Sequence, residues 1–331
     1  MNKALHIVSS FVGGSGNTII SAQLADFFGG VAVDGAVGEK NLIRFKGIKV
    51  MNIEYINNFV TKNSDGGINY EVYFSDLFEL SKAMLVDDVD NVKIDNVVID
   101  FDSSLSKTFF RSIQEVVGFK EALKSDGVKL YIHLIVPTTN LLVGSKILGV
   151  FKELDILKEL EDESVVVWVN TYNRVPPKDF SLATFSQKAE GVIGSKLRDV
   201  VSVGEWSVAV KQVVDEYLQS RTLSDLLSKP PKGCDGFKIG RLKRYDLDFK
   251  EVIENLFPDT YSIEGDEDEE SLIGNDDNSN VSEVSEEASV SGDVPISEND
   301  NEGLFEEPAK ETEEGSNDNN KDGQDEEIDR Q

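Results

Sequence analysis

Cysteine and histidine are scarce in this sequence, which contains only Cys234, His6 and His133. A single cysteine cannot form a disulfide within the chain, which fits a reducing compartment such as the cytoplasm. So few cysteines and histidines also exclude a metal cluster built from these residue types. Both histidines lie in apolar, strand-like runs, and we therefore expect them to be core residues.

Long apolar runs are missing as well. No stretch approaches the roughly 20 apolar residues that a membrane-spanning helix needs. The apolar run at residues 4–8 is too short for a secretory signal, and glycines follow it closely. We therefore expect a soluble, cytoplasmic protein without a membrane anchor.

Positive charge is sparse and unevenly spread. The chain has 33 Lys and Arg against 62 Asp and Glu, a net charge of −29. Residues 262–331 hold 26 acidic and 3 basic residues, a net charge of −23, which leaves about −6 for residues 1–261. The acidic segment is also poor in large apolar residues, so it cannot offset the entropy lost on ordering. We predict one folded domain, 1–261, and a disordered acidic tail, 262–331.

Two roles for the acidic tail remain open. It is either a solvating segment or a docking segment that binds a basic partner or competes with DNA for a basic surface.

Short β-branched runs alternate with helix-length segments along the body. Strands are expected at 4–10, 30–34, 48–53, 96–101, 129–137, 164–170 and within 199–206. Helices are expected at 18–28, 75–86, 105–125, 139–161, partly over 180–197, and at 207–229 and 237–257. The strands at 129–137 and 164–170 are apolar on both faces, which is typical of a parallel sheet covered by helices on both sides. The pattern predicts an α/β fold with a doubly wound, mostly parallel sheet.

Polar residues follow several of these strands. They are the segment SSFVGGSGNT (9–18), Asp34, Asp100, the segment PTTN (137–140) and Asn170. The carboxyl ends of parallel strands meet at one edge of a sheet, where ligands bind. We therefore expect all five to face one crevice.

The glycine-rich segment has the layout of a phosphate-binding loop. Gly13, Gly14 and Gly16 let the backbone wrap a phosphate, and the N–H groups of residues 13–18, Ser15 included, point toward it at the start of a helix. Thr18 lies where a hydroxyl contacts Mg²⁺. Asn17 stands where such a loop carries lysine, and losing that charge weakens ATP binding by one to a few decades. A plain strand–turn–helix junction is the alternative.

The order of motifs makes the resemblance more specific. The chain resembles the ParA/MinD family of P-loop ATPases, whose deviant Walker A loop reads K-G-G-x-G-K-T where this sequence has V-G-G-S-G-N-T. Segment 31–42 resembles the family's D-x-D-x-G-x-x-N-L through Asp34, Gly38, Asn41 and Leu42. Strand 96–101 resembles the Walker B strand, and strand 164–170 resembles the later strand that ends on an adenine-contacting Asn. The similarity covers about half the chain and implies a P-loop NTPase type of fold.

The resemblance implies ATP and Mg²⁺ as cofactors. Thr18 and Asp100 would lie beside the metal, Asp34 near the phosphates, and Asn170 at the adenine. The departures fall on the chemistry: Val12 replaces the lysine that reaches across the dimer, Asn17 replaces the lysine in cis, and Ala36 replaces the aspartate that positions water. No catalytic residue is assigned, and we expect slow or absent ATP hydrolysis.

The densest basic cluster of the body comprises Lys238, Arg241, Lys243 and Arg244. ParA-like proteins bind DNA non-specifically through such residues, whereas a solvated helix face or a pairing site for the acidic tail are the alternatives. The resemblance implies a protein partner from partition or transfer machinery and allows a homodimer. An acidic tail disfavours an anionic membrane, unlike the membrane helix of MinD-like proteins.

Three functions are compatible with the sequence. The first is a divergent ParA/MinD-like protein in plasmid or chromosome partition, plasmid stability, conjugation or the positioning of a cellular assembly. The second is a non-enzymatic pseudo-ATPase scaffold whose tail docks a basic partner. The third, a ligase similar to dethiobiotin synthetases, is disfavoured because such enzymes need the loop lysine that Asn17 replaces.

Overall fold

The structure is a computed structural model. It describes residues 3–29, 31–36, 41–51, 69–86, 93–115, 119–137, 141–153, 157, 160–171, 180–203 and 216–258. The chain divides into two units, Met1–Glu267 and Asp268–Gln331, and every described residue belongs to the first. The acidic tail predicted at 262–331 therefore lies outside the described residues.

Seven parallel strands form one sheet. Their bounds are β1 (Lys3–Ser9), β2 (Val31–Asp34), β3 (Lys49–Met51), β4 (Asn96–Asp100), β5 (Val128–Pro137), β6 (Val165–Asn170) and β7 (Leu197–Val203). The order across the sheet is β3-β2-β4-β1-β5-β6-β7, and each neighbouring pair is parallel. The chain crosses to opposite sides of β1 before and after β4, so the sheet is doubly wound. The predicted α/β fold class is confirmed.

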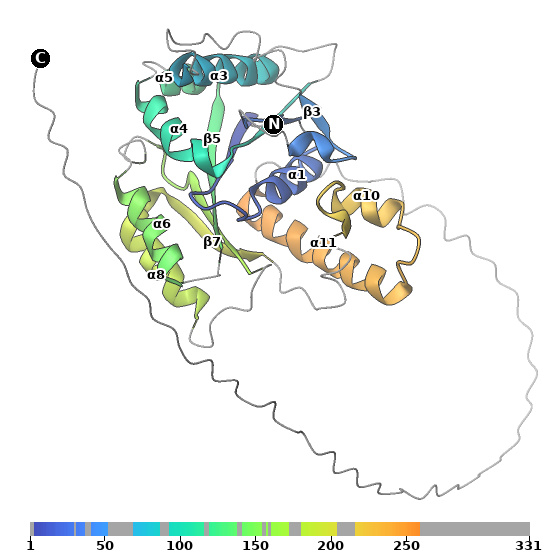
Figure 1. Cartoon of the computed structure of the whole chain (residues 1–331). Helices are drawn as coiled ribbons and strands as arrows, with labels where there is room; N and C mark the ends of the chain where they lie inside the picture. The colour runs from blue at the N-terminus through green and yellow to red at the C-terminus, as the bar shows by residue number, and fades with distance from the viewer. Residues whose placement is uncertain are drawn as a thin grey trace, which may run out of the picture. The chain divides into compact units, whose positions relative to one another are not determined.

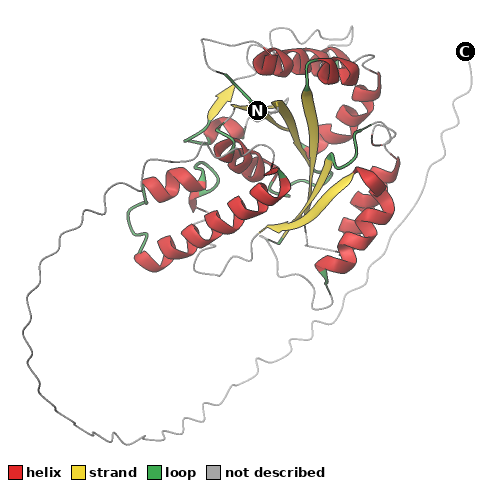
Figure 2. Cartoon of the chain, turned by 180° about the vertical axis from the view of Figure 1, so that it is seen from behind, coloured by secondary structure: helices red, strands yellow, loops and turns green. Residues whose placement is uncertain are grey.

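The helices cover both faces of this sheet (Figures 1 and 2). Their bounds are α1 (Asn17–Phe27), η1 (Leu42–Arg44), α3 (Tyr70–Val86), α4 (Ser103–Glu115), α5 (Phe119–Ser125), α6 (Leu141–Glu153), α8 (Leu182–Ile193), η2 (Gly194–Lys196), α10 (Leu223–Ser228) and α11 (Gly236–Leu256). In the part of the chain described here, no helix combines the length and the apolar character needed to cross a bilayer.

One prediction within this set is wrong. A single helix was expected over 207–229, but its described part contains a turn at Leu218–Ser220. Thr222 then starts a new helix, because its Oγ1 accepts a hydrogen bond from the Asp225 N–H at 3.3 Å. The sequence Thr-Leu-Ser-Asp is a capping signal inside an otherwise helical pattern, and it outweighs the continuity of that pattern.

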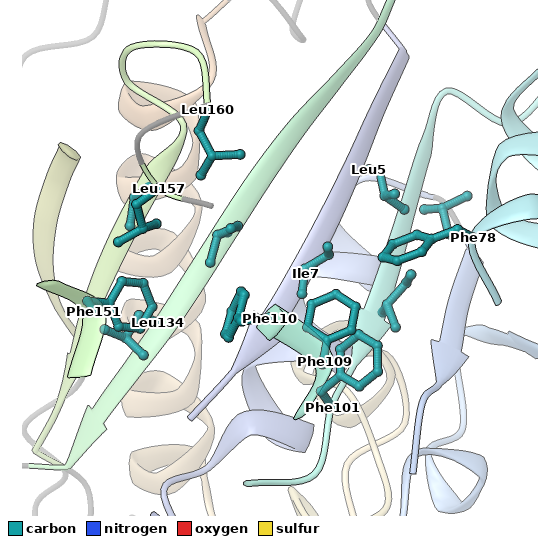
Figure 3. Packing of buried hydrophobic residues seen from close by; sticks show 14 of the residues in the cluster. Leu5, Ile7, Phe78, Phe101, Phe109, Phe110, Leu134, Phe151, Leu157 and Leu160 are labelled. Carbon is teal, nitrogen blue, oxygen red and sulfur yellow. The ribbon is translucent and has the colours of Figure 1, made fainter. Parts of the chain in front are cut away.

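The larger hydrophobic core lies between the sheet and helices α3, α4, α5, α6 and α8. Alternate residues of the strands, such as Leu5 and Ile7 of β1, point into it. Aromatic side chains from α4 fill its centre: Phe109 stacks on Phe101 with ring centroids 4.0 Å apart (Figure 3). Because both faces of the central strands β1, β2, β4 and β6 are buried, these strands read as largely apolar.

The smaller core lies on the other face, beneath α1 and α11. It contains Val8, Val98 and Trp168 from the sheet, and Phe249 and Ile253 from α11. This packing fixes α1 against the sheet, and α1 carries the residues that follow the glycine loop.

Both histidines are buried beneath this face, as predicted. The Trp168 Nε1–H donates to His133 Nδ1 at 2.9 Å, so the His133 proton is on Nε2 and points to His6 Nδ1 at 3.0 Å. The His6 Nε2–H in turn donates to Asn96 Oδ1 at 3.2 Å. Burial lowers the pKa of His6 to about 4 and holds the pKa of His133 well below its usual value. Both rings are therefore neutral structural links between β1, β4, β5 and β6.

Candidate functional site

The glycine loop connects the end of β1 to the start of α1. Gly14 and Gly16 have φ values of 70° and 89°, a left-handed conformation that other residues adopt only with strain. Gly16 immediately precedes α1 and provides no side-chain cap. The first N–H groups of α1 therefore face the loop without a capping side chain, as an anion-binding helix start requires.

A serine network holds the base of the loop. The Ser10 Oγ–H donates to Ser15 Oγ at 2.8 Å, and Ser10 Oγ also accepts the Val12 N–H at 3.1 Å. The Ser15 hydroxyl donates to the Val12 carbonyl. Ser106 of α4 donates to the Ser10 carbonyl at 2.8 Å and ties the loop to the larger core. The backbone is thus positioned before any ligand arrives.

A cavity of about 430 Å³ opens above the loop. Its lining comprises Val12, Gly13, Gly14, Ser15, Gly16, Asn17, Thr18, Ile19, Asp34, Ala36, Asn41, Arg44, Phe45, Asp100, Phe101, Asp102, Ser103 and Gln219. The structure thus brings together the loop and the acids at the ends of β2 and β4, as the sequence predicts. Within the segment 137–140, only Pro137 is described, and Gly38 also lies outside the described residues.

Two buried carboxyl groups form one wall. Asp34 and Asp100 occupy the same register position on neighbouring strands. Asp34 accepts the N–H groups of Ala36 at 3.1 Å and Leu42 at 2.9 Å, which shapes the turn after β2. Burial, and secondarily the charges of Asp34 and Asp102, raise the pKa of Asp100 to about 7. A cation beside Asp100 would therefore favour the ionised form of its carboxyl group.

The two residues predicted beside a metal are in direct contact. The Thr18 hydroxyl hydrogen-bonds Asp100, and the Ser21 Oγ–H donates to Asp100 Oδ1 at 2.9 Å. The described residues include no group of three or more acidic, His or Cys side chains arranged to hold a metal ion. Thr18 and Asp100 can hold Mg²⁺ only together with water and ligand oxygens, which is the way this ion is usually bound.

Asn17 does not substitute for the missing lysine. Its Nδ2–H donates to the Phe101 carbonyl at 3.0 Å, although the residue lines the cavity. Its Oδ1 is buried without a hydrogen-bond partner in the structure. An amide oxygen is an acceptor, so this atom cannot contribute to phosphate binding except through a shared proton or cation.

Asn170 supports the loop from the neighbouring strand. Its Nδ2–H donates to the Ser15 carbonyl at 2.7 Å, and the residue is not part of the cavity lining. A Cβ atom on Gly16 would lie 2.6 Å from the same Nδ2, so the two residues are packed tightly. The adenine contact implied for Asn170 by the family resemblance stays a prediction.

Several lining residues were not singled out from the sequence. Asp102 follows Asp100 by two residues and also caps α4, accepting the Ser104 N–H at 2.7 Å. Arg44 comes from η1, two residues after the quoted Asn-Leu pair. A second acid after Asp100 was a usable signal for Asp102, whereas nothing local marks Arg44 or Gln219, which reach the cavity through tertiary packing.

Phe11 and Val12 precede the glycines, and only Val12 lines the cavity. Phe11 packs into the larger core, with ring centroids 5.5 Å from Phe151 and 6.0 Å from Phe110. Val12 is half-buried against that core and lines the cavity, as does Ala36. Apolar groups therefore occupy the two positions where the family resemblance implies a dimer-bridging lysine and a water-positioning aspartate.

The four basic residues predicted to contact DNA all lie on the first half of α11. Arg241 stacks over the exposed ring of Phe237 at 4.5 Å from its centroid. At about 100° per residue, Lys243 points about 160° away from Arg241 around the helix. The cluster is thus split between two sides of α11.

No protein-family model and no curated protein matches this sequence. The resemblance to the ParA/MinD family stays a prediction, which is based on the order and spacing of the motifs.

Proposed function

We propose that this protein is a divergent ParA/MinD-like nucleotide-binding protein. It would act in plasmid or chromosome partition, plasmid stability, conjugation or the positioning of a cellular assembly. It would bind ATP with Mg²⁺ at the glycine loop and hydrolyse it slowly or not at all.

One observation carries this proposal: the loop 13–18, the start of α1 and the acids Asp34 and Asp100 line a single cavity. Its volume of about 430 Å³ lies in the range of small-molecule sites, roughly 300–1,000 Å³. Backbone N–H groups at a helix start favour phosphate oxygens. The contact between Thr18 and Asp100 supports the proposal, because a hydroxyl and a carboxyl group side by side offer the hard oxygen ligands that Mg²⁺ prefers.

The acids also explain why Mg²⁺ belongs in the proposal. Asp34, Asp100 and Asp102 all line the cavity, and these carboxyl groups repel a phosphate that is not neutralised. A bound Mg²⁺ would supply the neutralising charge between these carboxyl groups and a phosphate. The backbone N–H groups of residues 13–18 would hold the phosphates, and Thr18 and Asp100 would hold the metal.

Calorimetric titration of ATP·Mg²⁺ tests this function. The wild-type protein should bind, and Asn17→Lys should bind tighter by a decade or more, because a charge-assisted contact contributes roughly 1.5–3 kcal/mol. Gln187→Lys is the matched control: it adds the same charge on the exposed surface of α8, outside the cavity lining. If both lysines tightened ATP binding equally, the cause would be long-range attraction and not a contact between the lysine introduced by Asn17→Lys and the phosphates.

A non-enzymatic scaffold is the second candidate, favoured by the hydrogen bond that ties the Asn17 amide to Phe101. In that case the cavity is a remnant, and the acidic residues 262–331 would bind a basic protein. No measurable heat of ATP·Mg²⁺ binding in either the wild type or Asn17→Lys would reject the nucleotide function and leave this candidate.

The proposed DNA contact is independent of the cavity. Replacing Arg241 and Arg244 together by Gln should weaken non-specific duplex binding and reduce its salt dependence by about two charges. Retention assays at two salt concentrations measure both quantities. Unchanged binding would assign the four basic residues to a solvated helix face.

A further inference from the structure

The cavity above the glycine loop is lined by a positively charged residue that does not belong to the loop. Among the described residues that line it, Arg44 is the only cation, and it stands with Asp34, Asp100 and Asp102 around the same space. A phosphate-binding loop usually obtains this charge from a lysine at the position of Asn17. The cavity therefore lacks its usual cation on one wall and has another cation on a different wall.

The backbone that carries Arg44 is firmly placed. The Leu42 N–H donates to Asp34 Oδ2 at 2.9 Å, and the side chains of Leu42 and Phe45 are buried in the smaller core. Beyond them, the Lys46 N–H donates to the Ser220 carbonyl at 2.9 Å. Short links on both sides thus fix η1 at the mouth of the cavity.

The chemistry of the side chain suits a phosphate. A guanidinium keeps its charge at every relevant pH and presents a planar fork of donors that matches two phosphate oxygens. Arg44 is exposed and lines the cavity. Asp34 links the two parts directly, since it shapes the turn leading to η1 and also lines the cavity.

We propose that Arg44, in the segment after β2, is the phosphate-binding cation of this site. It would take over the role of the loop lysine, whose position Asn17 occupies. This inference rests on the proposed nucleotide function and identifies a specific binding residue within it. Arg44 would contact the phosphate oxygens of the nucleotide rather than the base or the ribose.

Calorimetry on the full-length protein with ATP·Mg²⁺ tests the inference. Arg44→Gln should raise the Kd roughly ten- to hundredfold. Arg44→Lys should recover part of the loss, because it restores the charge without the planar fork. Lys46→Gln is the matched control, since it removes the same charge from an exposed side chain two residues away that does not line the cavity.

A rescue variant and a second ligand identify the contact. In the double variant Arg44→Gln, Asn17→Lys, the new lysine should restore much of the affinity lost in Arg44→Gln. Inorganic triphosphate with Mg²⁺ should lose affinity in Arg44→Gln by about the same factor as ATP. A loss for ATP without a loss for triphosphate would place Arg44 at the base or ribose and overturn the assignment.

The outcomes separate the two proposals. If wild type binds ATP·Mg²⁺ and Arg44→Gln binds as Lys46→Gln does, the role of Arg44 is rejected while the nucleotide site stands. If wild type does not bind, the proposed function fails, and the role of Arg44 fails with it. Thermal midpoints of Arg44→Gln and Lys46→Gln close to that of wild type show that both proteins are folded.

Discussion

Asp34 and Asp100 lie directly opposite each other at the carboxyl ends of β2 and β4, and both are buried. Asp34 is held by two backbone N–H groups, whereas Asp100 has two hydroxyl groups, from Thr18 and Ser21. Despite its two hydroxyl partners, burial raises the pKa of Asp100 and so disfavours its ionised form.

The first prediction concerns the pH dependence due to Asp100. Its pKa is raised from 3.8 to about 7, so the folded protein holds a proton that the unfolded chain has lost between these values. Stability therefore falls as the pH rises through this window. Without metal, Asp100→Asn should be more stable than wild type above pH 7, by roughly 2–4 kcal/mol, and the gain should vanish near pH 4.

Urea unfolding at pH 8 and pH 4.5, with a chelator present, measures this difference. Asp102→Asn is the comparison: Asp102 is exposed, and its replacement keeps an oxygen that can cap α4. It should stabilise the protein much less, because the Asp102 charge is only a minor cause of the raised Asp100 pKa. A destabilised Asp100→Asn protein at pH 8 would contradict the prediction.

The buried histidines predict a dependence of opposite sign. Folding lowers the pKa values of His6 and His133. Below pH 6.5 both histidines therefore bind protons in the unfolded chain while they stay neutral in the folded protein. The stabilisation is fully present above pH 6.5 and is lost below it, at about 1.4 kcal/mol per pH unit for each histidine. No carboxyl group is among the described contacts of the two rings, which are Asn96, Trp168, Phe28, Tyr131 and Phe257.

Unfolding of the Asp100→Asn protein between pH 6.5 and pH 5 isolates this contribution, since the carboxyl at position 100 is then absent. A flat stability profile in that interval would show that the His6–His133 pair is protonated or solvated in the folded protein.

Gly16 should not tolerate a side chain. Gly16→Ala combines a left-handed φ of 89° with a Cβ placed 2.6 Å from Asn170 Nδ2. We expect a loss of about 2 kcal/mol or more in the free energy of unfolding. Gly149→Ala on α6, where a Cβ has no neighbour within 4 Å, should be neutral or stabilising by about 0.5–1 kcal/mol. Equal effects at the two positions would contradict the tight contact between loop and β6.

ATP hydrolysis should be very slow. Val12, Asn17 and Ala36 stand where the family resemblance implies two lysines and the aspartate that positions the attacking water. Asn17→Lys should improve binding far more than turnover, because Ala36 still cannot position water. Phosphate release assays measure the turnover. Wild-type turnover at rates ordinary for P-loop ATPases, abolished by Asp100→Ala, would overturn this expectation.

Removal of residues 262–331 should change the thermal midpoint by no more than a degree or two. Their composition offers few apolar side chains for burial. Scanning calorimetry of the shortened protein measures the midpoint. A drop of many degrees would mean that this segment packs on the folded body.

The sequence predicted the sheet and the loop because their signals are local. Apolar runs reveal strands wherever both faces are buried, and glycines followed by Thr18 reveal a helix start. Arg44 could not be found in this way, since its place depends on hydrogen bonds from Leu42 to Asp34 and from Lys46 to Ser220. The hydrogen bond that occupies the Asn17 amide was equally hidden, because it depends on the Phe101 carbonyl, 84 residues away.

The order of strands also sets when the site can form during synthesis. β1 is made first, yet His6 finds Asn96 only 90 residues later and His133 only after 127. The loop itself receives its support from Asn170, 155 residues beyond Ser15. Non-local pairing of this kind is slow because the intervening chain must first be closed into a loop. During synthesis, more than half of the chain must therefore be made before the first strand and its glycines can form the cavity.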